Sequence, residues 1–461
     1  MTSRSDNMTS HGHGADTIAG LPYHFTVLLS QLALLGELSR TALLENVHLL
    51  GISPTGERRM STAEVSDALE RLRAQGWLQK TGTRWALTPG LENSVFLWLL
   101  TQPEARKAIL GGPQPLPLYL RGVTQPDRAL LWTAILSGNV TVLPALLAKN
   151  AAYFDYFDAV DPTVTLFTDD AGQRVFTLLN EEVQSLLLAT ALNDASYRLS
   201  DCQPIWQFAR AQALSHKRIA ELLHGPLALQ ALLRNDRELL THLTANGLPL
   251  SVAGWFCLYR GDPAGATEVH RQLLGQYRKI TRSRQLHLPP LASVRVALTL
   301  LPSDKPADIK TLREVTRQAI AGGFGGEWSI LEGLLRERSG AALAHPPQMS
   351  SRAFSGMAGL LKALVLYWRG DIPDADKLCK QLEAFARLLE ARGYQLPAYD
   401  IRTILHLTFS QAAPTRPGEV QPLSSLWQRK PDWEYALEAL GQLMPKASSS
   451  DSRLAWLVAL G

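Results

Sequence analysis

The alternation of apolar and polar positions predicts a chain built mainly of α-helices. Apolar residues recur every three or four positions over 25–35, 39–50 and most of 91–445, and Gly-Asn, Gly-Asp or Asn-Gly pairs separate the runs. Two stretches are similar, since 251–303 and 364–409 each hold a Gly-Asp turn followed by a Leu-Pro pair. Repeated helical hairpins of this kind predict a tetratricopeptide-like array, whose surface usually binds a partner.

The N-terminal part carries the signals of a winged helix. Ser61 and Glu64 have the spacing of a capping box at a helix start, and Gly76 marks the end of that helix. The segment WLQKTGTRWALT, residues 77–88, then predicts two short strands about a Thr-Gly-Thr turn. The order helix, helix, capped helix and hairpin over 21–95 is that of a winged-helix domain.

Two uses of this predicted winged helix stay open. Winged helices that read DNA place the third helix in the major groove, where phosphates favour cationic and neutral polar groups. Here that helix carries acidic Glu64, Asp67 and Glu70 beside two arginines, which favours protein contacts or domain packing instead. Four cations flank the helix and are candidates for phosphate contacts: Arg58, Arg59, Lys80 and Arg84.

One segment in the middle of the chain departs from the helical period. In PTVTLFTDDAGQRVFTLL, apolar positions alternate on both sides of Asp-Asp-Ala-Gly, which predicts a β-hairpin near 163–178. With it we predict five parts: a disordered tail (1–20), the winged helix (21–95), a helical domain (96–250), a helical repeat domain (251–445) and a strand-like C-terminal segment (446–461).

Composition describes an ordinary folded protein. Of 461 residues, 46% are hydrophobic and 19% are charged, and the net charge of +4 is too small to indicate nucleic-acid binding by the chain as a whole. Any basic function must therefore be local. Three widely separated cysteines predict free thiols, and the absence of a long apolar run or a signal peptide predicts a cytoplasmic protein without membrane contact.

The sequence lacks the local motifs of the common catalytic sites. We find no GxxxxGK[ST] phosphate loop, no HExxH, no GxSxG and no CxxC, and the eleven histidines are scattered singly. We therefore predict a chain that is not an enzyme and that holds no cofactor and no metal.

The most one-sided charge in the chain lies in the first repeat. From Val269 to Ser303 there is no acidic residue. Cations at the end of a helix interact favourably with its dipole, worth a few tenths of a kcal/mol, but the cluster of four at 278–284 exceeds that need. Contact with the phosphates of a nucleic acid is the sharper interpretation. The basic residues of the run are Arg271, Arg278, Lys279, Arg282, Arg284 and Arg295, of which all but Arg295 are candidate nucleic-acid-binding residues.

A resemblance adds a functional expectation. RGDPAGATEVHRQLLGQYRKITRSRQLHLP resembles a segment in the long N-terminal regions of large bacterial Swi/Snf-type helicase-like ATPases, and the closing DSRLAWLVALG looks like the strand that leads into their later part. Every ATPase motif of that family is absent here. The resemblance thus implies a non-catalytic accessory region that works with a helicase-like ATPase module in cis or in trans. Some such ATPases belong to phage-defence systems.

Two other functions stay open on the residues alone. One is a transcription regulator that joins a winged helix to a helical sensor region, and the other is a pure protein-interaction scaffold. The surface charge of 269–295 distinguishes them from a weak, non-specific DNA binder. A continuous basic face favours nucleic acid, whereas arginines held by neighbouring Asp and Glu favour the scaffold.

Overall fold

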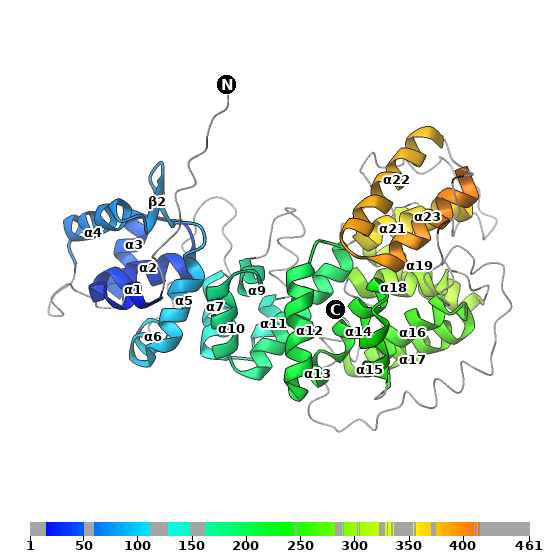
Figure 1. Cartoon of the computed structure of the whole chain (residues 1–461), viewed down its shortest axis with the longest axis horizontal. Helices are drawn as coiled ribbons and strands as arrows, with labels where there is room; N and C mark the ends of the chain where they lie inside the picture. Colours follow the sequence, from blue (N-terminus) through cyan, green and yellow to red (C-terminus); the bar gives the residue numbers. More distant parts are fainter. Residues whose placement is uncertain are drawn as a thin grey trace. The chain divides into compact units, whose positions relative to one another are not determined.

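A computed structural model shows a mainly helical protein with one small sheet (Figure 1). The chain divides into two compact units, Met1–Leu187 and Leu188–Gly461, and each is described by itself. The structure describes residues 15–49, 60–110, 128–147, 162–244, 247–281, 288, 290–301, 303, 305–321, 328–329, 331–332, 335, 354, 356–369, 375–409, 411 and 414.

The first unit combines a three-stranded antiparallel sheet, in the order β1-β3-β2, with helices that follow it. Its core forms where α5 packs against α2 and α10, and where the Phe96 ring lies 4.3 Å from the Trp132 ring between centroids. The elements are α1 (Ala15–Ala19), α2 (Tyr23–Leu35), β1 (Leu38–Ser39), α3 (Arg40–Leu49), α4 (Thr62–Ala74), β2 (Leu78–Thr81), β3 (Arg84–Leu87), α5 (Glu92–Thr101), α6 (Pro103–Leu110), α7 (Arg128–Ser137), η1 (Pro162–Val164), α9 (Thr165–Thr168) and α10 (Asp170–Leu178).

The capped helix and the hairpin form as the sequence predicts. The backbone amide of Ser61 donates to the Glu64 carboxylate over 2.6 Å, and the Glu64 amide donates to the Ser61 hydroxyl over 3.3 Å, so α4 begins with a complete capping box. Gly76, at φ +81°, follows the helix in the left-handed region that favours glycine. The side chains of α4 that are buried are those of Val65, Ala68, Leu69 and Leu72.

The β-hairpin predicted near 163–178 is wrong, because this segment folds as η1, α9 and α10. Asp169 accepts from the backbone amide of Gly172 and so caps α10 at its N-terminus, where the sequence suggested a strand turn. Gly172, Val175, Phe176 and Leu179 are buried or nearly so at helical spacing. The apparent alternation over so few residues did not distinguish the two-residue period of a strand from the 3.6-residue period of a helix.

The predicted domain limits differ from the observed ones in two places. Helix α1 occupies residues 15–19 within the predicted disordered tail, and its Ile18 side chain is fully buried. The unit boundary falls inside α11 (Glu181–Arg198), whereas the predicted boundaries lie at 95 and 250. The predicted strand-like segment 446–461 lies outside the described residues.

All regular elements that the structure describes in the second unit are helices. Helix α16 packs against α17 and α18, and α23 packs against α21 and α22. After α11 the helices are α12 (Gln203–Ser215), α13 (Lys217–Leu222), α14 (His224–Arg234), α15 (Arg237–Thr244), α16 (Leu250–Tyr259), α17 (Pro263–Thr281), α18 (Pro290–Leu300), α19 (Pro306–Ala321), α21 (Gly356–Arg369), α22 (Ala375–Ala391) and α23 (Gln395–Phe409).

The two similar stretches fold into the same order of helices. The first forms α16, α17 and α18, and the second forms α21, α22 and α23. In the first copy Gly261 has φ +77°, and Asp262 caps α17 by accepting from the Gly265 amide over 2.9 Å. The corresponding Gly370-Asp371 turn lies outside the described residues. A helical array, as predicted, thus carries the basic run.

A buried arginine ties the second copy to α14. The Arg234 guanidinium lies 4.7 Å from the centroid of the Tyr394 ring and donates to the Arg392 carbonyl, next to the left-handed Gly393. Gln230 accepts from the Arg234 Nε over 3.0 Å, and the Cys202 sulfur lies 3.1 Å from the same guanidinium. Cys202, Cys257 and Cys379 are free thiols, the first two buried.

Candidate nucleic-acid interface

The basic run begins on α17, a helix of 19 residues with one apolar face. Ala266, Val269 and Leu273 are buried toward α16 and α18, so the cations of the helix occupy the other side. Arg278 and Lys279 lie in the last turn, where positive charge interacts favourably with the helix dipole.

Arg271 is held by carboxylates and serves the fold. Its guanidinium makes a two-pronged contact with Asp308 of α19, at 3.1 Å from Nε to Oδ1 and 2.7 Å from Nη2 to Oδ2. A further contact of 3.3 Å joins it to Glu268. Burial alone would raise the pKa of Asp308, but hydrogen bonds from Arg271 and Ser303 lower it below its usual range. Arg271 thus links α17 to the start of α19 and is a poor candidate for phosphate binding.

Arg295 of α18 is also removed from the surface. Its side chain is only 4% exposed, and burial lowers the pKa of its guanidinium to about 10. Nearby, His270 is fully buried, with one ring nitrogen 3.0 Å from the Ala266 carbonyl and the other 3.3 Å from the Thr299 hydroxyl. Two of the six cations in the acid-free run are therefore structural.

Arg278 and Lys279 remain available at the end of α17. Lys279 is exposed, and the Arg278 guanidinium lies 3.9 Å from the Glu314 carboxylate, with side chains 43% and 32% exposed. An ion pair this long and this exposed contributes about 0–1 kcal/mol, so an approaching phosphate can displace it. Arg282 and Arg284, the other members of the predicted cluster, lie outside the described residues.

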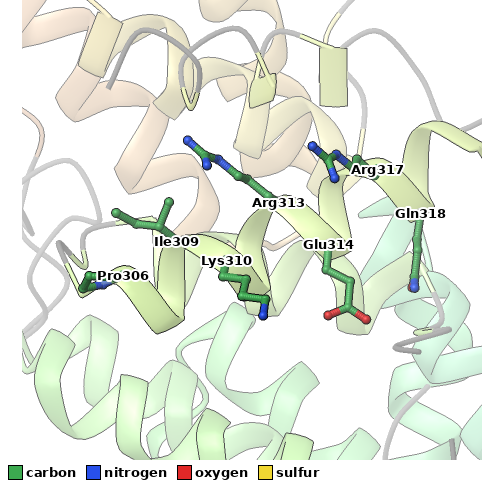
Figure 2. Close-up of a pocket in the computed structure, with 7 residues that line it drawn as sticks. All are labelled: Pro306, Ile309, Lys310, Arg313, Glu314, Arg317 and Gln318. Carbon is green, nitrogen blue, oxygen red and sulfur yellow. The ribbon is translucent and has the colours of Figure 1, made fainter. Parts of the chain in front are cut away.

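Helix α19 adds three cations that the sequence analysis did not select. Lys310, Arg313 and Arg317 follow one another at intervals of three and four residues and therefore lie within two successive turns of the helix. They line an open pocket of about 620 Å³ together with Pro306, Ile309, Glu314 and Gln318. Arg313 and Arg317 extend to one flank of α19 with Ile309, and Lys310, Glu314 and Gln318 extend to the other (Figure 2).

Two of the four predicted cations of the first unit lie on its hairpin. Lys80 of β2 lies 3.4 Å from Glu70 and 4.7 Å from the centroid of the Trp85 ring. Arg84 is exposed at the start of β3, opposite Thr81 in the strand pairing. Arg58 and Arg59 lie outside the described residues.

The exposed charges of α4 neutralise one another. Asp67 lies 2.9 Å from Arg71, and Glu70 lies 2.8 Å from Arg73. Pairs of this exposure contribute little to stability, but they leave the helix without an excess of positive charge. The face that would enter a DNA groove in a winged helix is thus electrostatically balanced.

The predicted site residues belong to two separate groups. Arg271, Arg278 and Lys279 belong to the second unit, whereas Lys80 and Arg84 belong to the first. Within the second unit the structure brings Arg278 to Glu314, which extends to the same flank of α19 as Lys310. A helical projection of the segment PADIKTLREVTRQAIA would have shown the spacing of the α19 cations, so the sequence did contain a signal for them.

Other chemistry is sparse in the part of the chain that the structure describes. No three His, Cys, Asp or Glu side chains there come together as a metal ion would require. Within the same residues no helix has the length and apolar character needed to cross a bilayer. No protein-family model, curated protein or solved structure matches the chain.

Proposed function

We propose that the chain binds nucleic acid weakly and without sequence preference, through backbone phosphates. The observation that carries this proposal is the end of α17, where exposed Arg278 and Lys279 continue a run that lacks any acidic residue from 269 to 303. Arg282 and Arg284 follow directly in sequence and belong to the same proposed cluster. Phosphate contacts of this kind supply affinity and orientation but read no bases.

We propose that residues 21–95 of the first unit form a winged helix in which the hairpin, and not α4, faces the partner. The element order α2, β1, α3, α4, β2, β3 supports the winged helix, and the balanced charges on α4 speak against base reading by that helix. Lys80 and Arg84, with Arg58 and Arg59, would supply auxiliary phosphate contacts. The same balanced face of α4 favours protein contact as a second role, because paired charges suit a polar interface.

We further propose that the helical array is tetratricopeptide-like and that the chain is a non-catalytic accessory region of a bacterial Swi/Snf-type helicase-like ATPase, present in cis or in trans. The proposal rests on the resemblance of the α17 segment and on the missing ATPase motifs. A role in phage defence and a cytoplasmic location, the latter consistent with free Cys202 and Cys257, belong to the same proposal.

Binding across a salt series tests the nucleic-acid role. A fourfold variant, R278A/K279A/R282A/R284A, is compared with wild type on a short DNA duplex of mixed sequence. If each cation neutralises one phosphate, the four contribute a log-log slope of roughly −3.6, at ~0.9 per contact. The variant should flatten the wild-type slope by several units.

A control variant removes three exposed cations from α22, Lys377, Lys380 and Arg387. This control should keep the wild-type slope, because α22 lies outside the proposed surface. If wild type does not retain DNA at low salt, or if the fourfold variant keeps the wild-type slope, the basic run is a solvated helix end. The protein-interaction scaffold, or the regulator with a helical sensor, then becomes the better interpretation.

A further inference from the structure

We infer that α19 carries the main phosphate-binding surface of the second unit, formed by Lys310, Arg313 and Arg317. This inference rests on the proposed nucleic-acid role and extends it to residues outside the acid-free run. We call these three residues the α19 cationic surface. Nucleic acid would lie along α19 and reach Arg278 in the last turn of α17.

The three cations differ from Arg271 in what surrounds them. Within the described part of the chain, Lys310 and Arg317 are exposed and make no ion pair. Arg313 is half-buried and donates to the Leu335 carbonyl over 3.4 Å, a distance at which a hydrogen bond is weak. Among the described residues, no tight carboxylate contact therefore competes with a phosphate for these three side chains.

The single carboxylate of the pocket is shared with a fourth cation. Glu314 lies between Lys310 and Gln318 on one flank of α19, and Arg278 of α17 approaches it to 3.9 Å (Figure 2). The pocket-lining side chains and Arg278 together include four cations and one carboxylate, and Arg313 and Arg317 extend to the flank of α19 opposite Glu314. The positive charge of α19 therefore exceeds its negative charge on this stretch, and Arg278 adds a further cation beside Glu314.

The spacing of the cations suits a regular row of phosphates. At 1.5 Å per residue, Lys310 and Arg317 are separated by about 10 Å along the helix axis. Phosphates of one DNA strand advance by about 3.4 Å each, so the same length of duplex presents roughly three on that strand. Arg313 and Arg317, one turn apart, each offer the planar fork of donors that matches phosphate oxygens.

An acidic protein segment is the other polyanion that this charge would attract. Stable protein interfaces bury apolar and aromatic anchors at their centre and are depleted in lysine. The pocket lining offers only Pro306 and Ile309 as apolar side chains, at one end of the row. Phosphate binding needs no such anchor, and the observations therefore favour nucleic acid.

The test is a charge-only variant, K310Q/R313Q/R317Q, measured on the same duplex in a salt series. We expect the log-log slope to flatten by about 2.7, at ~0.9 for each of three phosphates, and the low-salt affinity to fall. The matched control is K377Q/K380Q/R387Q, which removes the same charge from exposed positions of α22 and should keep the wild-type slope. Circular dichroism and the thermal midpoint confirm that both variants remain folded.

A second variant is expected to change the affinity for the duplex in the opposite direction. Glu314→Gln removes the one negative charge among the pocket-lining residues and releases Arg278, so low-salt affinity for the duplex should rise by several-fold. The control Glu221→Gln breaks a similar pair with Arg218 on α13, at 3.8 Å, and should leave affinity unchanged.

The outcomes separate this inference from the proposed function. If the fourfold variant R278A/K279A/R282A/R284A flattens the slope and K310Q/R313Q/R317Q does not, nucleic-acid binding stands and the α19 surface is wrong. If wild type binds no duplex, both fail. If a poly-glutamate peptide binds wild type and loses affinity with K310Q/R313Q/R317Q while DNA does not bind, the partner is an acidic protein segment and the inference is overturned.

Discussion

Replacement of Arg271 by Gln separates the structural cations of the basic run from those that face solvent. Arg271 and Asp308 are joined by two hydrogen bonds of 3.1 and 2.7 Å, and Asp308 is only 3% exposed. The Gln side chain keeps most of the length of Arg271 but cannot supply the charge or the two-pronged contact. The Ser303 hydroxyl would still donate a hydrogen bond to the Asp308 carboxylate.

The expected loss follows from this geometry. Removing one partner of a fully buried pair costs about 3–5 kcal/mol, because an uncompensated charge stays behind. Here the Arg271 side chain is 36% exposed, so water can reach the carboxylate that it leaves. We therefore expect a local destabilisation of about 1–2 kcal/mol, which corresponds to a change of roughly 5–30-fold in an opening equilibrium.

Hydrogen exchange read by mass spectrometry measures this effect where it occurs. Peptides from α17 and α19 should exchange faster by that factor, and peptides from α2 to α5 in the other unit should not change. The control Arg71→Gln breaks a pair whose side chains are 66% and 62% exposed and should change exchange little. Unchanged protection of α17 and α19, or a flatter DNA salt slope in the Arg271 variant, would refute the assignment of Arg271 to the fold.

Two further predictions concern pH and catalysis. Burial lowers the pKa of His270 to about 4 from 6.5, the bond to the Ala266 carbonyl opposing and the Arg295 charge adding to this shift. Between these values the unfolded chain takes up a proton that the folded chain does not, so stability should fall by about 1.4 kcal/mol per pH unit below 6.5 and this loss should end near 4. The urea-unfolding midpoint of a His270→Gln variant should lack this part of the pH dependence, and equal pH profiles would contradict the prediction. Purified chain should release no phosphate from ATP above background, since no phosphate-binding loop occurs in the sequence; turnover abolished by one substitution in this chain would show otherwise.

Sequence motifs correctly predicted the elements that are fixed by contacts between residues close in the sequence. The capping box of Ser61 and Glu64 and the turn at Gly261-Asp262 use contacts within four residues, and both form as expected. The prediction for 163–178 was wrong because its apolar residues fit both the period of a strand and that of a helix. The N-cap at Asp169, whose carboxylate accepts a hydrogen bond from Asn93 of α5 over 2.8 Å, favours the helix. Asn93 is too distant in sequence for a local pattern to include it.

Whether a surface cation is held in an ion pair or is available to a phosphate depends on residues outside its own helix. Arg271 and Arg278 lie on one helix and look alike in sequence, but Asp308 holds the first at 2.7 Å and Glu314 meets the second only at 3.9 Å. Both carboxylates come from α19, beyond the end of the acid-free run. A stretch without acidic residues therefore does not by itself determine the electrostatic potential at its surface. The neighbouring helix α19 contributes as well. Its Asp308 carboxylate binds Arg271 and so removes it from the candidate site, and its lysine and two arginines extend that site.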